Sequence, residues 1–193
     1  MNKGIACYIV LVFLAFQCYA QSVNLYQQSF KTIDGKTFSA TGSRATVFVF
    51  YSTSCPICKL YTKTLRETID SFARHSIKLC LIFPGEFFSK REIKKFQKEY
   101  NLKATAILDK DMKLALLFDA RVTPEAFVID STGLRYRGKI DNWFEDIGKH
   151  RTVITQHHLA DALDAILAGK KIAVEKTEAV GCFITSHYRE LKE

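Results

Sequence analysis

Apolar residues recur along this chain with two different periods. Residues 46–52 form a continuous apolar run, the pattern of a central strand that is buried on both faces of a sheet. Residues 77–83 form a second such run. Between the two runs, residues 56–74 have helical spacing, with one predicted apolar face made of Leu60, Leu65, Ile69 and Phe72. The pattern predicts a strand, a helix and a second strand in succession.

The rest of the pattern extends this order towards the C-terminus. Asp34-Gly35 predicts the turn of a β-hairpin within residues 30–38, and Ser89 is a suitable N-cap for a second helix. The remaining predicted elements are a strand at 104–108, a short helix at 111–120, paired strands at 125–130 and 134–140, and a helix at 157–168 with Gly169 as its C-cap. Alternating strands and helices imply parallel strands with right-handed crossovers, and the last strand pair adds antiparallel ones. The predicted fold class is α/β, a three-layer sandwich around a mixed central β-sheet, with an N-terminal β-hairpin and helices on both faces.

The first twenty residues have the features of a leader. Lys3 supplies a positive charge, residues 5–16 are apolar, and a short polar stretch leads to Ala20. This order is typical of a secretory signal peptide, with cleavage expected after Ala20. The apolar run is shorter than the ~20 residues of a spanning helix, so a retained membrane anchor is the less favoured alternative. We expect a signal peptide at 1–20, one domain at 21–193, and a periplasmic or other extracytoplasmic location.

The charge balance is basic, with 28 Lys and Arg against 20 Asp and Glu in 193 residues and a net charge of +8 at pH 7. An exported chain without a nucleic-acid-binding motif argues against a nucleic-acid partner. The basic residues are interspersed with acidic ones, which is typical of solvated helix faces. We expect contact with a membrane only through the leader, if the leader stays uncleaved.

Four of the six cysteines lie beyond the leader: Cys55, Cys58, Cys80 and Cys182. Four are too few to staple a chain of this size, and export makes disulfide chemistry available to them. Cys55 and Cys58 form a C-x-x-C motif at the start of the predicted helix 56–74. The bare motif also occurs in zinc ribbons and haem attachment sites, but the unpaired N–H groups and macrodipole of a helix start favour a thiolate. The context therefore favours a thiol–disulfide exchange site.

Three segments carry a resemblance to a known family: residues 50–58 with the C-x-x-C motif, residues 122–130 with Thr123-Pro124, and residues 136–141. On these motifs the chain resembles the thioredoxin superfamily over about residues 25–183. It is most similar to exported TlpA-like redoxins, which are related to the alkyl hydroperoxide reductase/thiol-specific antioxidant (AhpC/TSA) group. The resemblance implies a thioredoxin-like fold, with Thr123-Pro124 as a cis-proline loop opposite the dithiol that presents its backbone to a bound partner. A cis X-Pro bond costs as little as ~0.5–1 kcal/mol, and an extended chain can pair with the backbone of Thr123.

The chain also departs from the family's pattern beside the motif. Ser54 precedes Cys55 where tryptophan is common in thioredoxins. Tyr61 stands where TlpA-like proteins often carry a glutamate, three residues after the second cysteine. The sequence therefore assigns no acid–base partner to Cys58.

The leading functional hypothesis is dithiol–disulfide exchange with cysteines of exported proteins, and with an upstream electron donor or acceptor. Cys55, expected to be exposed at the start of the helix, would attack a substrate disulfide, and Cys58 would resolve the mixed disulfide. We expect neither a cofactor nor a bound metal for this reaction. The direction of electron flow is left open by the motif alone.

Two other chemistries compete with exchange. A thiol peroxidase would use Cys55 as the peroxidatic residue and Cys58 or Cys182 as the resolving one. Ser52 fits the peroxiredoxin pattern, but Pro124 replaces the activating arginine. A Sco-like copper site would need the two thiolates and a histidine, for which three residues qualify by type: His150, His157 and His158.

The last two cysteines have different expected roles. Cys80 alternates within the apolar run 77–83 and is expected in the core. Cys182 follows Gly181, and three roles stay open for it: a resolving cysteine, a structural one, or an unpaired cysteine on a terminal strand.

Overall fold

The structure is a computed structural model, and it describes residues 25–184. The expected signal peptide at 1–20, with Cys7 and Cys18, lies outside the described residues. Among residues 25–184, no helix is long and apolar enough to cross a membrane.

The central sheet has five strands, in the order β5-β4-β3-β7-β8. Their bounds are β3 (Ala45–Phe50), β4 (Ile77–Pro84), β5 (Thr105–Asp109), β7 (Glu125–Asp130) and β8 (Gly133–Gly138). Strand β4 pairs in parallel with β3 and β5, whereas β7 pairs antiparallel with β3 and β8. The sheet is therefore mixed, as the sequence pattern predicts, and its middle strand β3 is buried along its whole length.

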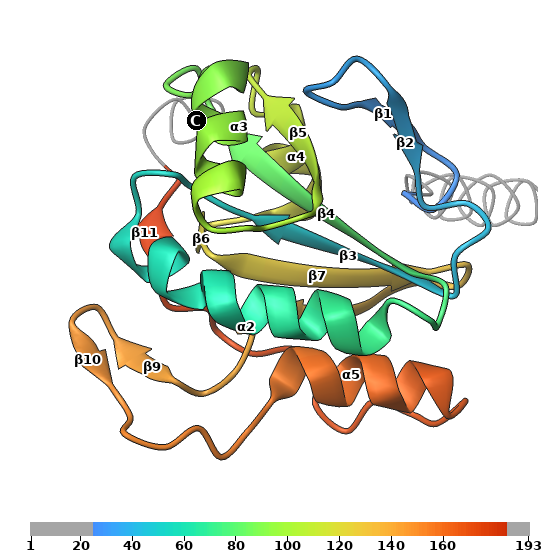
Figure 1. The fold of residues 1–193 in the computed structure, drawn as a ribbon. Coiled ribbons are helices and arrows are strands. Elements are labelled where there is room, and N and C mark those ends of the chain that lie inside the picture. The colour runs from blue at the N-terminus through green and yellow to red at the C-terminus, as the bar shows by residue number, and fades with distance from the viewer. Residues whose placement is uncertain (1–24, 185–193) are drawn as a thin grey trace, which may run out of the picture.

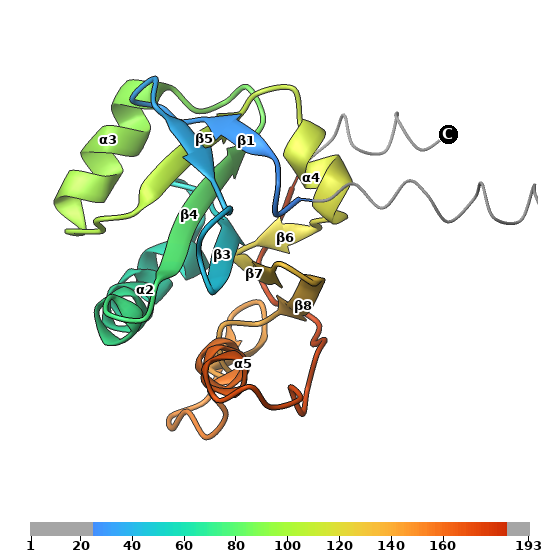
Figure 2. The same cartoon turned by 90° about the vertical axis from the view of Figure 1, so that its right-hand side faces the viewer.

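Helices cover both faces of this sheet (Figure 1). Their bounds are α2 (Pro56–Phe72), α3 (Lys90–Glu99), α4 (Lys113–Phe118) and α5 (His158–Leu167). Figure 2 shows α2 and α3 on one side of β3 and β4, and α4 on the other side. The alternation of side chains along β3 explains the two cores: Val47 and Val49 pack towards α2, α3 and α5, while Phe48 and Phe50 pack towards α4.

The remaining strands are short: β1 (Ser29–Lys31), β2 (Thr37–Ser39), β6 (Val122–Thr123), β9 (Phe144–Asp146), β10 (Lys149–His150) and β11 (Cys182–Phe183). The β1–β2 hairpin is confirmed, and its Phe38 joins the α4 side of the core. The α/β fold, its element order and its thioredoxin-like layout agree with the prediction.

One predicted helix face is partly wrong. Leu60 is half exposed, and the buried face of α2 is instead made of Ile57, Cys58, Tyr61, Thr62, Leu65 and Phe72. Leu60 and Leu65 are five residues apart, which turns them about 140° from each other around a helix. The residues three and four positions apart, Cys58, Tyr61 and Leu65, define the face that packs on the sheet.

The chain after α5 makes a pairing that the sequence pattern did not indicate. It passes along the outer edge of β8 and ends in β11, which pairs antiparallel with β6. Cys182 lies opposite Thr123 in this pairing, and Phe183 lies opposite Val122. In Figure 1, β11 lies beside the N-terminal end of α2. The C-terminal segment thus reaches the place where the C-x-x-C motif begins.

Candidate functional site

The C-x-x-C motif lies at the junction of β3 and α2. Cys55 is the N-cap residue of α2, with an extended backbone (φ −73°, ψ 120°), and Pro56 is the first helical residue. Proline suits that position because its missing N–H would have no partner within the helix. The side chain of Cys55 makes no capping hydrogen bond. Because Cys55 is the N-cap residue, its sulfur lies near the positive end of the helix dipole.

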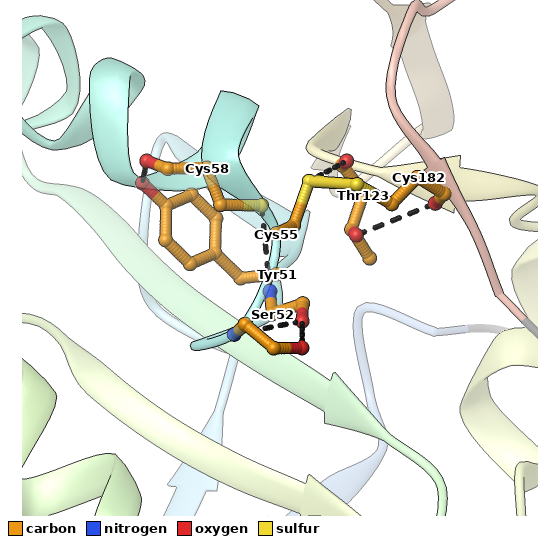
Figure 3. Close-up of a disulfide and its surroundings, with 7 residues drawn as sticks. Tyr51, Ser52, Cys55, Cys58, Thr123 and Cys182 are labelled. Carbon is orange, nitrogen blue, oxygen red and sulfur yellow. Dashed lines mark hydrogen bonds between the residues drawn. A yellow bond between two sulfur atoms is a disulfide. The ribbon is translucent and has the colours of Figure 1, made fainter.

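Cys55 is bonded to Cys182 in this structure, across 127 residues of sequence (Figure 3). This differs from the expectation that Cys55 pairs with Cys58, which is a free thiol here. It also differs from the expectation of an exposed nucleophile, because only 2% of Cys55 is exposed. Both differences have one cause: β11 lies on β6 and places Cys182 directly over the start of α2. Of the three roles left open for Cys182, the unpaired one does not apply to this state.

The Cys58 thiol is completely buried, one helical turn along from Cys55. Burial raises the pKa of Cys58 to about 12, although hydrogen bonds with the Ser52 N–H and the Thr123 side chain act against the rise. The Ser52 N–H donates to the Cys58 sulfur at 3.4 Å. In Figure 3, Cys55 stands between Cys58 and Cys182. The free thiol of Cys58 therefore lies in the protein interior, on the side of Cys55 that faces away from Cys182.

The Thr123–Pro124 peptide bond is cis, as the resemblance implied. The carbonyl oxygen of Thr123 lies 3.2 Å from the sulfur of Cys55. The Thr123 hydroxyl donates to the carbonyl of Cys182 at 3.4 Å. Thr123 is thus the residue that contacts both halves of the disulfide, and the structure brings it together with the dithiol.

Gly181 makes the closest backbone approach at the site. A Cβ atom at this position would lie 2.2 Å from the carbonyl oxygen of Thr123 and 3.1 Å from the nitrogen of Pro124. Any side chain here would have to push β11 away from β6. Glycine before Cys182 is therefore what allows the two strands to meet.

A buried carboxylate stands beside Tyr61, the residue that replaces the expected glutamate. The Tyr61 hydroxyl donates to Oδ1 of Asp141 at 2.6 Å, and the Trp143 N–H donates to the same oxygen at 2.8 Å. Oδ2 of Asp141 has no hydrogen-bond partner among the described residues, and only 1% of Asp141 is exposed. Burial and the neighbouring carboxylate together raise the pKa of Tyr61 above its ordinary value. Tyr61 also lines a small hollow with Pro124 and Val180.

Asp141 belongs to the segment 136–141 that carries the family resemblance, but the sequence pattern did not indicate its contact with Tyr61. The absence of the expected glutamate was the available indication of this contact, because a carboxylate missing from helix α2 can be supplied by the loop after β8. The other candidates take no part in the site. Cys80 is fully buried in the α4 side of the core, as expected, and burial raises its pKa. Within residues 25–184, no group of three or more His, Cys, Asp or Glu is arranged to hold a metal ion.

The sequence model of the AhpC/TSA family matches residues 17–136, more than half of the chain. The chain belongs to the AhpC/TSA family. A search of curated proteins finds no match. The cis-proline loop opposite the C-x-x-C motif agrees with the place of this chain in the wider thioredoxin superfamily.

Solved structures show the same fold. An uncharacterised conserved protein from Geobacillus kaustophilus has a TM-score of 0.74 and 22% identity, and the match covers 83% of this chain and 90% of that one. A hypothetical protein from Sinorhizobium meliloti has a TM-score of 0.72 and 23% identity, with coverages of 85% and 95%. A secreted disulfide oxidoreductase from Mycobacterium tuberculosis, described as homologous to E. coli DsbE, has a TM-score of 0.55 and 16% identity, with coverages of 77% and 99%. At these identities the likeness concerns the fold.

Proposed function

We propose that this protein is an exported thiol–disulfide oxidoreductase whose reactive sulfur is Cys55. The observation that carries the proposal is the environment of that sulfur. It is at the N-terminus of α2, it is engaged in a disulfide, and the free thiol of Cys58 follows one turn later in the same helix. A sulfur held by a helix start between two other cysteines is arranged for exchange.

The reaction transfers one disulfide between two proteins. In the reducing direction, the Cys55 thiolate attacks a partner disulfide, and one partner sulfur leaves as a thiolate and takes up a proton. Cys58, once deprotonated, attacks Cys55 and releases the second partner thiol. The partner disulfide is reduced, and the Cys55–Cys58 dithiol is oxidised to a disulfide. The oxidising direction reverses each step, and an upstream donor or acceptor resets the pair.

Export is part of this proposal and rests on the leader. A positive residue, an apolar stretch and Ala20 in sequence order support secretion with cleavage near Ala20. The structural neighbour from Mycobacterium tuberculosis is itself a secreted protein. The proposed partners are thiols and disulfides of other exported proteins, with no nucleic acid involved.

A thiol peroxidase is the second candidate, and the AhpC/TSA family match favours it. A peroxidatic cysteine must meet hydrogen peroxide as a thiolate, whereas Cys55 is covered by β11 in this state. Ser52, which fits the peroxiredoxin pattern, has its hydroxyl bonded to the Ser54 hydroxyl at 3.0 Å. Reaction of the reduced protein with hydrogen peroxide separates the two functions, because a rate no higher than that of a free thiol removes the peroxidase.

Reduction of insulin by dithiothreitol tests the leading proposal. The chain from residue 21 should accelerate the reaction, and Cys55→Ser should lower that acceleration at least about 100-fold, because the attacking sulfur is gone. Cys80→Ala is the matched control: it removes a buried cysteine from the opposite side of the sheet and should leave the rate unchanged. A wild-type protein no faster than dithiothreitol alone would refute the proposal.

A further inference from the structure

The C-terminal segment, residues 173–184, is attached to the domain at two separate places. The first is Thr177, whose N–H donates to the carbonyl of Arg137 at 3.0 Å and whose hydroxyl accepts from the Lys139 N–H at 2.8 Å. Gly138 faces it closely, since a Cβ there would lie 2.2 Å from the carbonyl oxygen of Thr177. The second place is β11, with the Cys182 disulfide.

The stretch between these two attachments has no regular secondary structure of its own. Residues 178–181 form no helix or strand. A hollow of about 230 Å³ lies between residues 176–179 and the side chains of Val122 and Arg137. At the far end, Phe183 is 73% exposed. Strand β11 is held by its short pairing with β6, by the hydrogen bonds of Thr123 with Cys182 and of Ile184 with Arg121, and by one disulfide. A hinge after Thr177 would let it move away.

Strand β11 occupies the position that a partner chain must take. A disulfide offered to Cys55 has to bring its own sulfur to the place of the Cys182 sulfur. The chain carrying it would then run along β6, because β6 has its backbone paired with β11 there. The Ile184 N–H already donates to the carbonyl of Arg121 at 3.0 Å, which continues the ladder past Phe183.

We propose that the C-terminal segment is an internal substitute for a protein substrate: β11 closes the β6 edge, Cys182 holds Cys55 in a mixed disulfide, and the release of Cys182 by Cys58 opens the site. This inference rests on the proposed function. It assigns Cys182 as a third redox cysteine, carried by a strand that covers the backbone of Thr123, where the resemblance already implies that a partner binds.

The opening step balances without an added oxidant or reductant. The Cys58 thiolate attacks the sulfur of Cys55, a Cys55–Cys58 bond forms, and the Cys55–Cys182 bond breaks. Cys182 leaves as a thiolate and takes up the proton that Cys58 lost. The protein keeps one disulfide throughout, so the step is an isomerisation.

The same geometry defines the class of partner. Because a Cβ at position 181 would lie 2.2 Å from the carbonyl oxygen of Thr123, a partner chain in this register needs glycine immediately before its cysteine. The preferred partner is therefore an extended segment containing Gly-Cys. Other side chains before the cysteine would force the strand off β6 and weaken the pairing.

The test uses oxidised wild-type protein and oxidised Cys182→Ser, both from residue 21. Two reduced peptides are the probes: one copies residues 178–184, and the other has alanine in place of the glycine. The rate of loss of the protein disulfide is followed by acid quenching and mass spectrometry. We expect the glycine peptide to react at least tenfold faster with Cys182→Ser than with wild type. On Cys182→Ser it should also react at least tenfold faster than the alanine peptide.

Each other outcome has a distinct meaning. Equal rates for wild type and Cys182→Ser would overturn the closing role of β11. Equal rates for the two peptides would overturn the requirement for glycine before the partner's cysteine. The peptide ratio is measured on one variant, so it does not depend on the amount of folded protein. Cys80→Ala, the cysteine-removal control, should behave as wild type. Reduction by 2-mercaptoethanol tests the proposed function separately. If the proposed function is wrong, oxidised Cys182→Ser contains no Cys55–Cys58 disulfide, and 2-mercaptoethanol finds no protein disulfide to reduce.

Discussion

The two regions that supply the Cys55–Cys182 disulfide are built in opposite ways. Cys55 is at the junction of a fully buried strand and a helix of 17 residues. Cys182 is in a two-residue strand near the end of a segment, residues 173–184, in which half of the residues are exposed. The first region is fixed by the core, whereas the second is held by Thr177, by its short pairing with β6 and by the disulfide itself.

This difference separates chemistry from access. The strand–helix junction determines which sulfur reacts, because it places Cys55 at a helix start and Cys58 behind it. The C-terminal segment determines what can reach that sulfur, because it covers the β6 edge. Cys58 and Cys182 are therefore not equivalent partners of Cys55, and substitutions in the two regions should have different signatures.

The largest difference is expected from Cys58→Ser. While a partner occupies the β6 edge, β11 is displaced and Cys182 is removed from Cys55, so only Cys58 can resolve the mixed disulfide. The variant should lengthen the lifetime of a mixed disulfide with the glycine peptide at least about 100-fold, whereas Cys182→Ser should not. Quenched-flow trapping measures both lifetimes. If the two variants resolved the intermediate equally fast, the two cysteines would be equivalent after all.

The conversion of Cys55–Cys182 into Cys55–Cys58 should depend strongly on pH. Because burial raises the pKa of Cys58 to about 12, the thiolate fraction rises about tenfold per pH unit below that value, so the rate should increase about 100-fold from pH 7 to pH 9. Burial also raises the pKa of Tyr51, whose hydroxyl bonds to the carbonyl of Cys58, so Tyr51 stays neutral across this range. Time courses quenched in acid provide the rates, and a flat profile would mean that Cys58 is not the attacking group.

Gly181→Ala tests the fit of the second region with the first. The added Cβ would collide with the carbonyl of Thr123. A misfit of about 1–3 kcal/mol corresponds to a shift of about 5-fold to 150-fold in the oxidised protein, from Cys55–Cys182 to Cys55–Cys58. The ratio is measured by disulfide mapping at equilibrium. An unchanged ratio would show that β11 does not need its close approach to β6.

The smallest effect is expected from Tyr61→Phe, in the first region. Loss of the hydroxyl leaves Oδ1 of Asp141 with the Trp143 N–H as its donor, which should lower the free energy of unfolding by about 1 kcal/mol. The ratio of the two disulfides should stay the same, because β11 is not involved. Urea denaturation measures the stability. Tyr26→Phe, which removes a hydroxyl bonded to the carbonyl of Ser43, is the matched control on the other side of the sheet.

Most of the fold follows from the sequence because its elements are long enough to show a period. The continuous apolar run before Cys55 and the helical spacing after it are direct consequences of burial on the sheet. The pairing of β11 with β6 has no such signal. Two residues show no period, and their partners are 59 to 61 positions away along the chain.

The candidate site could be predicted only in part for the same reason. Local context marks Cys55 and Cys58, the family resemblance adds Thr123 and Pro124, and the structure places these four residues together. The bond between Cys55 and Cys182 depends on a close approach that only the assembled fold defines. The role of Gly181 depends on the carbonyl of Thr123 lying beside it, which the sequence alone does not indicate.

The most direct measurement is the disulfide pattern of the singly oxidised protein, mapped after acid quenching at pH 7 and pH 9. We predict both Cys55–Cys58 and Cys55–Cys182, converting into each other more quickly at pH 9, with Cys80 free throughout. A Cys55–Cys182 bond that is alone at all times and at both pH values would contradict this prediction, because Cys182 would then be a structural cysteine that permanently covers Cys55.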